Sequence, residues 1–416
     1  MNKKEFVTDV ILFFFILYAF RVPFLYNSTV VAIIFLLMLA VFRTKINVRF
    51  MKNKSLLLQC VLYFSLVVLI FVMGTFHLTY DYSKINVLYS QAFSFFGVIL
   101  FISKINNSQD VKDITRYTFE IISIAFIAQC LFILIAFASN DFRVFISQFQ
   151  ANTRTEGTIR EGVRALSFAG GQYFTLTVAF MVCNVVLGFY LAFYRKSSFV
   201  LFVIIQIFVS LTASTAGRTF FISVPFSFLI FFYYSYYYNN PNVKSFFSNI
   251  TLFFIVTFSS ISLLSVLKID NLDQYVNFIF EFAINYLEYG TVETESTSVL
   301  SRMYFDLSMD TILLGHGHYT NSDGSYYLHT DAGFMRNVLY YGLFGLLINY
   351  LIFSLKLVVI ANNQKTLFSF VLFILLTIAH IKGEAIAHII GVEVLLWTLF
   401  FVGLIEKNRF ENTDRH

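Results

Sequence analysis

The strongest constraint on this chain is a succession of apolar segments, each close to the length of a helix that crosses a lipid bilayer. Such a helix needs about 20 mostly apolar residues. Charged residues make up only 13% of the 416 residues, about half of their share in soluble domains. We therefore expect an all-α polytopic membrane protein, with a single integral membrane domain over residues 1–416.

Hydropathy and charge placement predict about twelve transmembrane helices. Two of the expected spans, 28–42 and 199–213, are short, so helix tilt or local thinning of the bilayer must accommodate them. A turn is needed at residues 213–217, because residues 199–237 would otherwise form one impossibly long helix. The expected spans are residues 7–26, 28–42, 55–74, 85–102, 117–138, 173–194, 199–213, 217–237, 248–267, 333–355, 366–382 and 386–404.

The placement of Lys and Arg predicts the orientation, because cytoplasmic segments of membrane proteins are enriched in both. With the N-terminus inside, 18 of the 29 Lys and Arg residues, Lys356 among them, fall in cytoplasmic segments. Most of the other 11 lie in or beside two outer loops, a first periplasmic loop at 139–172 and a large one at 268–332, between spans 9 and 10. The positive-inside rule does not explain these outer arginines, so they need another explanation.

Several classes of protein are disfavoured by motifs that the chain lacks. The first apolar segment follows Lys3 and Lys4 as in a signal peptide, but no small-x-small cleavage site comes after it, so we expect a retained span. The three cysteines fall inside apolar spans and have no metal-binding spacing. The sequence has no GxxxxGK[ST], GxGxxG or DxD pattern, so we expect an activity that uses neither a cofactor nor a nucleotide.

Two arginines at the outer side are candidates for binding an anion. Arg218 follows Ser214 and Thr215, either of which can cap the helix that we expect to begin there, and a helix N-terminus favours anions. The alternative interpretation is that the Arg218 side chain only extends to the membrane interface. Arg302 lies in an expected surface helix over 298–310, where an i,i+4 salt bridge to Asp306 is the competing explanation.

Three further arginines, Arg154, Arg160 and Arg164, lie in the first outer loop. Gly170 and Gly171 follow them and permit close approach of the backbone to a ligand. A solvated basic loop explains the same pattern equally well, so the sequence leaves both interpretations open.

The sharpest signal is His329 with Asp331. Thr330 or Asp331 is expected to cap the helix that opens at residue 332, which leaves His329 just outside a helix N-terminus. A positive dipole end disfavours an imidazolium, so His329 should be neutral and able to accept a proton. Asp331 could orient the ring or act as the base itself, and Arg336 supplies compensating positive charge.

Two smaller groups of polar residues complete the candidates. His380, Lys382, Glu384 and His388 lie near the outer ends of the last two spans and are expected to pair with one another or to line a cavity. His316 and His318 are too close together in a glycine-rich loop to favour a metal site, so we expect no metal.

These features together resemble the Wzy-type O-antigen polymerases of the O-antigen polymerase and ligase superfamily. The resemblance lies in the many spans, the large outer loop between late spans, and S214-T-A-G-R218 before a span. It continues in S301-R302, L314-G-H-G317, H329-T-D-A-G-F-M-R336 and Y341-G-L-F-G345. It covers the layout of nearly the whole chain, although the motifs are short.

The resemblance implies a GT-C-like glycosyltransferase at the periplasmic face of the Gram-negative inner membrane. The implied donor and acceptor are undecaprenyl-diphosphate-linked glycans, the implied partners are the bilayer and a chain-length regulator protein, and no nucleic acid is involved. In the implied reaction Arg218 and Arg302 stabilise the departing diphosphate, and His329 or Asp331 takes the proton of the acceptor hydroxyl. Arg154, Arg160 and Arg164 would hold sugar.

Two other functions compete with this one. An O-antigen ligase, which transfers the finished chain to lipid A core, shares the same arrangement of outer arginines and a loop histidine. A lipid-linked oligosaccharide flippase belongs to a different class and needs a charged cavity that is reached from both sides of the membrane. The gathering of ionisable residues on one side of the predicted bundle argues against transport.

Overall fold

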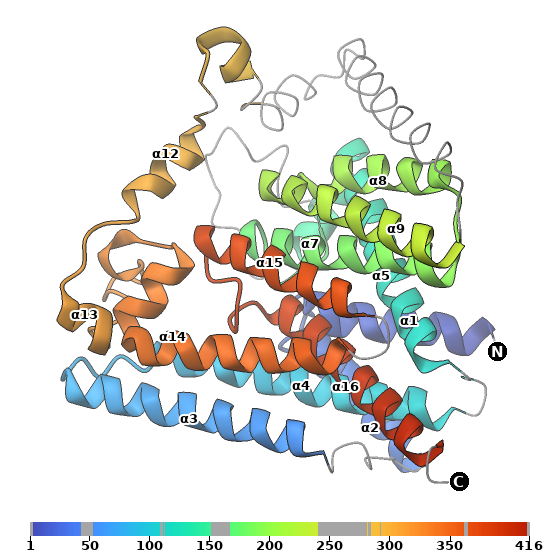
Figure 1. Cartoon of the computed structure of the whole chain (residues 1–416), viewed down its shortest axis with the longest axis horizontal. Coiled ribbons are helices and arrows are strands. Elements are labelled where there is room, and N and C mark those ends of the chain that lie inside the picture. Colours follow the sequence, from blue (N-terminus) through green and yellow to red (C-terminus); the bar gives the residue numbers. More distant parts are fainter. Residues whose placement is uncertain are drawn as a thin grey trace. The chain divides into compact units, whose positions relative to one another are not determined.

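The computed structural model describes residues 3–42, 53–108, 111, 113–150, 167–239, 281, 284–291, 293–361 and 365–413, and this part of the chain is mainly helical. The all-α class expected from the sequence is therefore confirmed (Figure 1). Among the described residues, six helices are long and apolar enough to cross a membrane, and three more are apolar but shorter. The number of spans and the orientation stay predictions.

The chain is organised as two compact units. Unit 1 combines the two ends of the chain, Met1–Ala19 with Phe24–Thr118 and Ser298–His416, and unit 2 comprises Phe20–Pro23 and Phe119–Thr297. Two helices belong to both: α5 (Ile114–Ala138) runs from unit 1 into unit 2, and α12 (Glu295–Arg302) runs from unit 2 into unit 1.

Unit 1 is a bundle in which segments from the two ends of the sequence pack together. Helix α14 packs against α3, α15 and α16, and α16 also packs against α4 and α1. The described elements that lie wholly in unit 1 are α1 (Lys3–Tyr18), α2 (Ser28–Phe42), α3 (Lys54–Phe76), α4 (Ser83–Asn107), α13 (Met309–Leu314), the short η4 (Tyr327–His329), α14 (Gly333–Ile360), α15 (Thr366–Lys382) and α16 (Ile390–Thr413).

Unit 2 is built around α7 (Phe174–Phe189), which is buried on nearly all sides and continues as the π-helix η2 (Tyr190–Tyr194). A buried amide network fixes its neighbours: Gln206 donates to Asn184 at 2.9 Å and to Ser227 at 3.0 Å. Such interhelical hydrogen bonds and small interface residues hold apolar bundles together. The other described elements that lie wholly in unit 2 are α6 (Asn140–Ser147), α8 (Phe199–Ala213), the 3-10 helix η3 (Arg218–Ile222) and α9 (Ser223–Asn239).

Helices occur at every expected span for which the structure describes residues, whereas the span expected at 248–267 lies outside the described residues. The predicted turn at 213–217 is present, since α8 ends at Ala213 and η3 begins at Arg218. The first expected span was too long. Helix α1 ends at Tyr18 because Ala19 adopts a left-handed backbone with φ of +41°, and Pro23 follows in the same loop.

Helix α14 is broken at Gly342, where φ is +66°. The glycine-rich loop after α13 lies against this break: the N–H groups of His316 and Gly317 donate to the carbonyls of Leu339 and Tyr340, at 2.6 and 3.2 Å. A Cβ on Gly342 would lie 2.2 Å from the carbonyl oxygen of Leu313. Irregular backbone inside an apolar bundle is tolerated only when such partners satisfy it. The two glycine motifs seen in the sequence are therefore a structural pair.

The link between α15 and α16 is extended and buried. Glu384 contacts Arg336 in the first turn of α14, whereas Glu393, nine residues later, contacts Lys356 near the end of α14. Those two α14 residues are 20 positions apart, or about 30 Å along a helix. A nine-residue helix would span only about 14 Å, and the chain covers more than that because residues 383–389 are not helical. Helix α16 consequently begins well inside the bundle.

The contact of Lys356 with Glu393 corrects one assignment made from the sequence. Lys356 was counted among the cytoplasmic charges, but it lies within α14, is fully buried, and forms an ion pair with Glu393. Tyr63 donates to the same carboxylate at 2.9 Å, and the Lys356 ammonium lies 4.2 Å from the centre of the Trp397 ring. This lysine is therefore a paired core residue and says nothing about orientation.

Candidate functional site

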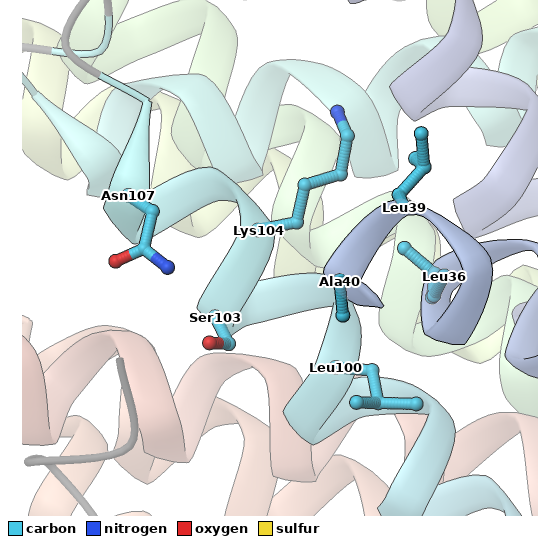
Figure 2. Close-up of a pocket in the computed structure, with 7 residues that line it drawn as sticks. All are labelled: Leu36, Leu39, Ala40, Leu100, Ser103, Lys104 and Asn107. Atoms are coloured by element: carbon cyan, nitrogen blue, oxygen red, sulfur yellow. The ribbon is translucent and has the colours of Figure 1, made fainter. Parts of the chain in front are cut away.

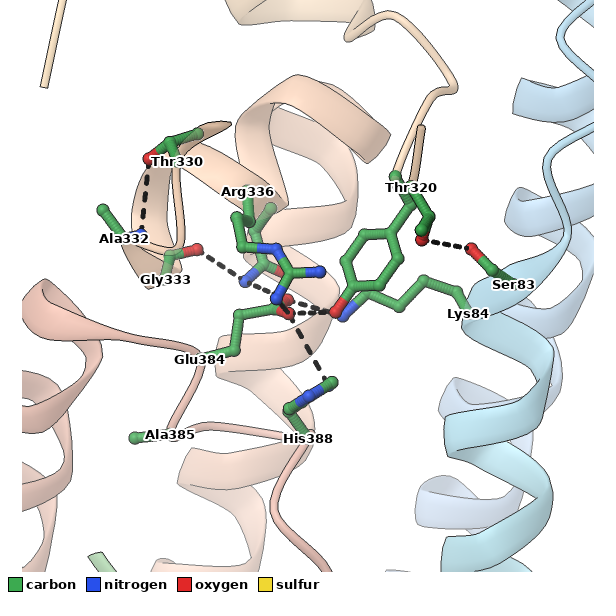
Figure 3. Close-up of polar contacts among 12 residues, drawn as sticks. Ser83, Lys84, Thr320, Thr330, Ala332, Gly333, Arg336, Glu384, Ala385 and His388 are labelled. Atoms are coloured by element: carbon green, nitrogen blue, oxygen red, sulfur yellow. Dashed lines mark hydrogen bonds and ion pairs between the residues drawn. The ribbon is translucent and has the colours of Figure 1, made fainter. Parts of the chain in front are cut away.

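A buried cluster of charged side chains lies at one end of unit 1, where α4 and α14 begin and α15 ends (Figure 3). Its centre is Glu384, just after α15. Lys84 on α4 donates to its Oε1 at 2.5 Å, and Arg336 on α14 reaches its Oε2 at 3.1 Å. The side chains of all three are 5% exposed or less. Two cations thus share one carboxylate in a site that excludes water.

The guanidinium of Arg336 is held between two aromatic rings. Its central carbon lies 3.9 Å from the centre of the Tyr319 ring and 3.8 Å from that of Tyr326. Planar guanidinium groups stack well on aromatic faces. Tyr319 also donates its hydroxyl to Glu384, so one side chain fixes both members of the ion pair. Tyr326 is 46% exposed and forms the outer side of the stack.

Two asparagines and a histidine orient the Glu384 carboxylate and the segment that carries it. Asn337 donates to Glu384 at 3.2 Å and accepts from Asn349 at 2.8 Å. His380 accepts the backbone N–H of Ala385 at 3.1 Å through Nδ1 and lies 3.2 Å from Asn337 through Nε2. The segment that carries Glu384 is therefore tied to α14 and α15 on both sides.

Gly333 allows the start of α14 to come this close. A Cβ at that position would lie 2.4 Å from the carbonyl oxygen of His380 and 2.5 Å from that of Gly383. Any larger residue would push α14 away from the end of α15 and separate Arg336 from Glu384. The glycine in the H329-T-D-A-G motif is thus required by packing.

Asp81, in the α3–α4 loop, holds the loop after α13 over the cluster. Its Oδ2 accepts the backbone N–H groups of Tyr319 and Thr320 at 2.6 and 2.9 Å, and its Oδ1 accepts from Ser83. Burial alone would raise the pKa of Asp81, but these hydrogen bonds outweigh it and lower the pKa below its usual value. The ionised form of Asp81 therefore fixes the position of Tyr319.

The electrostatics of the cluster keep Glu384 charged. Burial alone would raise the pKa of Glu384, but the charges of Lys84 and Arg336 lower it well below the usual range. Burial and the neighbouring Glu384 carboxylate raise the pKa of the Tyr319 hydroxyl well above its usual value, so Tyr319 remains a hydrogen-bond donor. His388 is close to Glu384 but, at 3.6 Å, beyond hydrogen-bonding distance.

The structure places His329 and Asp331 at the surface of unit 1, on the segment that leads into α14. His329 and Leu328 both have left-handed backbones, with φ of +53° and +52°. Each such residue costs on the order of 1–3 kcal/mol and is retained most often at functional sites. Burial raises the pKa of Asp331, and the charges of Arg336 and Lys382 oppose that rise. Lys382 itself is half-buried at the end of α15.

The expected capping of α14 was wrong. The N-cap residue is Ala332, and no side chain caps the helix. Thr330 instead accepts the N–H of Ala332 at 3.3 Å and donates to the carbonyl of Met303 at 3.1 Å, so it ties the segment to the chain after α12. Asp331 stays outside the helix as an exposed residue whose carboxyl group is partly buried, and it does not cap α14.

Arg218 lies in unit 2, and its expected cap was also wrong. Ser214 and Thr215 donate to carbonyls of α8, at 3.1 and 2.7 Å, and the N-cap of the short η3 is Gly217. The guanidinium of Arg218 pairs with Glu281 and donates to Ser296 at 3.3 Å. It is therefore already bound to a carboxylate in this structure.

Arg302 is exposed, and the continuous helix expected over 298–310 is broken. Helix α12 ends at Arg302, and α13 begins at Met309 with Ser308 as its N-cap. The Nε of Arg302 donates to the carbonyl of Ser298 at 3.3 Å. Because α12 ends at Arg302, Asp306 does not lie one helical turn away from it as the competing explanation required.

The remaining site residues include predicted ones that lie outside the described part of the chain and others that were missed in the sequence. Arg154, Arg160 and Arg164 lie outside the described residues. Arg336 pairs with Glu384, whereas the sequence predicted that Arg336 would compensate the charges of His329 and Asp331. Lys84 and Tyr319 were missed as site residues, because neither belongs to a motif. The signal that could have found Lys84 is a lysine at the first turn of an apolar span, where an ionisable residue needs a partner.

A hollow lies in unit 1 between α2 and α4 (Figure 2). Leu36, Leu39 and Leu100 line it, and Lys104 at its edge forms an ion pair with Asp9. Its walls are mainly apolar and its cation is taken by a carboxylate. The hollow therefore offers little for substrate chemistry, in contrast to the Glu384 cluster.

Comparisons with known proteins leave the site to be judged on its own geometry. No protein-family model, curated protein or solved structure matches this chain.

Proposed function

We propose that the chain is an O-antigen polymerase, a membrane glycosyltransferase that joins undecaprenyl-diphosphate-linked repeat units at the periplasmic face of the inner membrane. The observation that carries the proposal is the gathering of ionisable groups at one end of unit 1. Lys84, Arg336 and Glu384 are buried there, and His329 and Asp331 are exposed on the segment that leads into α14. With the predicted orientation this is the outer end.

The chemistry of such a site suits a donor that carries its own leaving group. A lipid-linked sugar departs from a diphosphate, which gains negative charge as the bond breaks, and preorganised cations in a dry site stabilise that charge. The acceptor hydroxyl attacks the anomeric carbon and loses its proton to His329 or Asp331. The raised pKa of Asp331 makes it a stronger base than an ordinary carboxylate. The polyprenyl tail stays in the bilayer beside the apolar helices.

The roles of Arg218 and Arg302 remain proposals. Arg218 would have to release Glu281 to bind a phosphate, whereas Arg302 is exposed and gives up only one hydrogen bond to a carbonyl. The ligase alternative shares all of this chemistry and differs only in the acceptor. The flippase alternative needs charges inside the bundle that face a substrate, but Lys356 and Glu393 bind each other and Tyr63.

Deletion of the gene followed by a lipopolysaccharide gel tests the proposal. A polymerase deletion should lose the ladder and retain core bearing a single repeat unit. Core without any repeat unit would contradict the proposal and indicate a ligase or a flippase. Complementation with the intact gene must restore the ladder, so that effects on neighbouring genes are excluded.

A further inference from the structure

One edge of the Arg336 guanidinium is buried and unused. Its Nη1 contacts Glu384 at 3.1 Å, whereas Nε and Nη2 have no hydrogen-bond partner among the described residues. The residue is only 5% exposed. Nε and Nη2 are the two donors of the side-on fork of an arginine, the arrangement that binds two oxygens of one carboxylate or phosphate.

A purely structural arginine would not be left in this state. A buried donor without a partner keeps the full cost of its lost hydration, and the cost is larger when the group is charged. The neighbouring backbone could have closed the fork with a carbonyl, as the carbonyl of Ser298 does for the Nε of Arg302. Tyr319 and Tyr326 cover the two faces of the guanidinium instead, so only its edge remains for binding.

The local charge also favours an anion. Lys84 and Arg336 carry two positive charges against the single carboxylate of Glu384. Asp331 lies near enough for the charge of Arg336 to lower its pKa, but no hydrogen bond or ion pair joins the two among the described contacts. An anion on the fork would therefore complete the charge balance and would lie beside the exposed candidate base.

We propose that the Nε–Nη2 edge of Arg336 is an oxyanion-binding subsite, which receives a phosphate or carboxylate group from the side of the exposed Tyr326. Naming the diphosphate of the lipid carrier as the physiological oxyanion rests on the proposed function. The subsite itself rests on the unused fork, the aromatic stack that fixes its plane, and the excess of positive charge.

The test uses the full chain, purified in detergent, with farnesyl diphosphate as a soluble short polyprenyl diphosphate. Binding is measured by equilibrium dialysis of the labelled compound. Arg336→Lys keeps the charge opposite Glu384 but loses the fork, so it should bind at least tenfold more weakly than the wild type. Arg116→Gln, which changes an exposed arginine at the start of α5, should bind as the wild type does. Each protein must elute as a single species in size exclusion.

Competitors distinguish the source of the oxyanion. Farnesol should not displace the label, whereas unlabelled farnesyl diphosphate should. Displacement by glucuronate but not by inorganic diphosphate would support the subsite and assign the oxyanion to an acidic sugar. Equal binding by the wild type and Arg336→Lys, or displacement by farnesol alone, would overturn the subsite.

The binding assay and the deletion strain distinguish an error in the subsite from an error in the proposed function. If binding depends on Arg336 but the deletion strain keeps its ladder, the polymerase proposal is wrong and the subsite stands. If Arg336→Lys makes a normal ladder and binds normally, the subsite is wrong and the polymerase proposal stands. Asp331→Asn removes a carboxylate that could otherwise occupy the Nε–Nη2 edge of Arg336. Unchanged or tighter binding of the label by this variant supports the subsite. Tenfold weaker binding in that variant would contradict it.

Discussion

Among the described residues, Glu384 is predicted to be the ionisable side chain whose loss destabilises the fold most. Glu384→Gln keeps the shape of the side chain but leaves the buried cations Lys84 and Arg336 without their carboxylate. Removing one partner of a buried ion pair costs about 3–5 kcal/mol. Because 1.4 kcal/mol corresponds to a factor of ten, the ratio of folded to unfolded protein should fall by about 100-fold or more.

The new amide at position 384 of this variant should increase the loss of stability. Its NH₂ group would point toward donors on Lys84, Arg336 or Asn337, whose present partners are the Glu384 oxygens. Lys84→Met removes one of the two cations, so the double variant with Glu384→Gln should lose less than the sum of the single losses. Directly contacting residues show such coupling energies of about 0.5–3 kcal/mol.

Thermal unfolding of the detergent-purified chain, followed by size exclusion after heating, measures these effects. Glu288→Gln changes an exposed glutamate and is the matched control, so its melting temperature should equal that of the wild type. The sign of the pH dependence follows from the lowered pKa of Glu384. Its contribution is present above the unfolded pKa of about 4.3 and is lost only as the pH falls through the lower folded value. Equal melting temperatures for Glu384→Gln and its control at neutral pH would refute the reasoning.

Three further predictions follow from other parts of the structure. Gly342→Ala should destabilise the fold by more than the ~1–2 kcal/mol that a left-handed alanine costs, because its Cβ would also meet the Leu313 carbonyl. Gly324 is left-handed as well but has nothing within 4 Å, so Gly324→Ala measures the cost of the backbone conformation alone in the same melting assay. If His329 is the base, His329→Ala should lose about 10²–10⁴ in rate and collapse the ladder while Asp331→Asn keeps residual polymer; full ladders from both would place the chemistry elsewhere. Alkaline phosphatase fused after Asn321 should be active and a C-terminal fusion inactive, and the reverse pattern would overturn the predicted orientation.

The sequence predicted most of the helices because each apolar span carries its own signal. The turn between α8 and η3 was found for the same reason, since a single helix would have been too long for a bilayer. Helix ends were predicted less well. The caps expected from Ser214 and Asp331 are absent, because side chains near a helix start can also bond to the preceding turn or remain exposed.

The candidate site was predicted only in part, because its members come from distant segments. Lys84 and Glu384 are 300 positions apart, and no periodicity in the sequence links them. Arg336 was interpreted as a charge that compensates His329 and Asp331, whereas its main partner is Glu384. Lys356 was assigned to a cytoplasmic segment, since pairing with Glu393 inside the bundle leaves no local signal.

The glycine motifs show where sequence and structure inform each other best. A glycine in a span is compatible with a kink, a close helix contact or a loop, and the sequence alone does not choose. The structure assigns Gly342 to a break in α14 and Gly333 to a close approach to the end of α15. Gly333 keeps the start of α14 next to the Glu384 cluster, and Gly342 lets the segment after α13 pack against the break.

Reconstitution tests the central proposal most directly. The purified chain in liposomes is given undecaprenyl-diphosphate-linked repeat units, without nucleotide or added metal, and the glycan products are separated by length. We predict products of two or more repeat units with release of undecaprenyl diphosphate, and none from a chain that carries both His329→Ala and Asp331→Asn. Repeat units that remain single with the intact chain, or that cross the bilayer without being joined, would contradict the account.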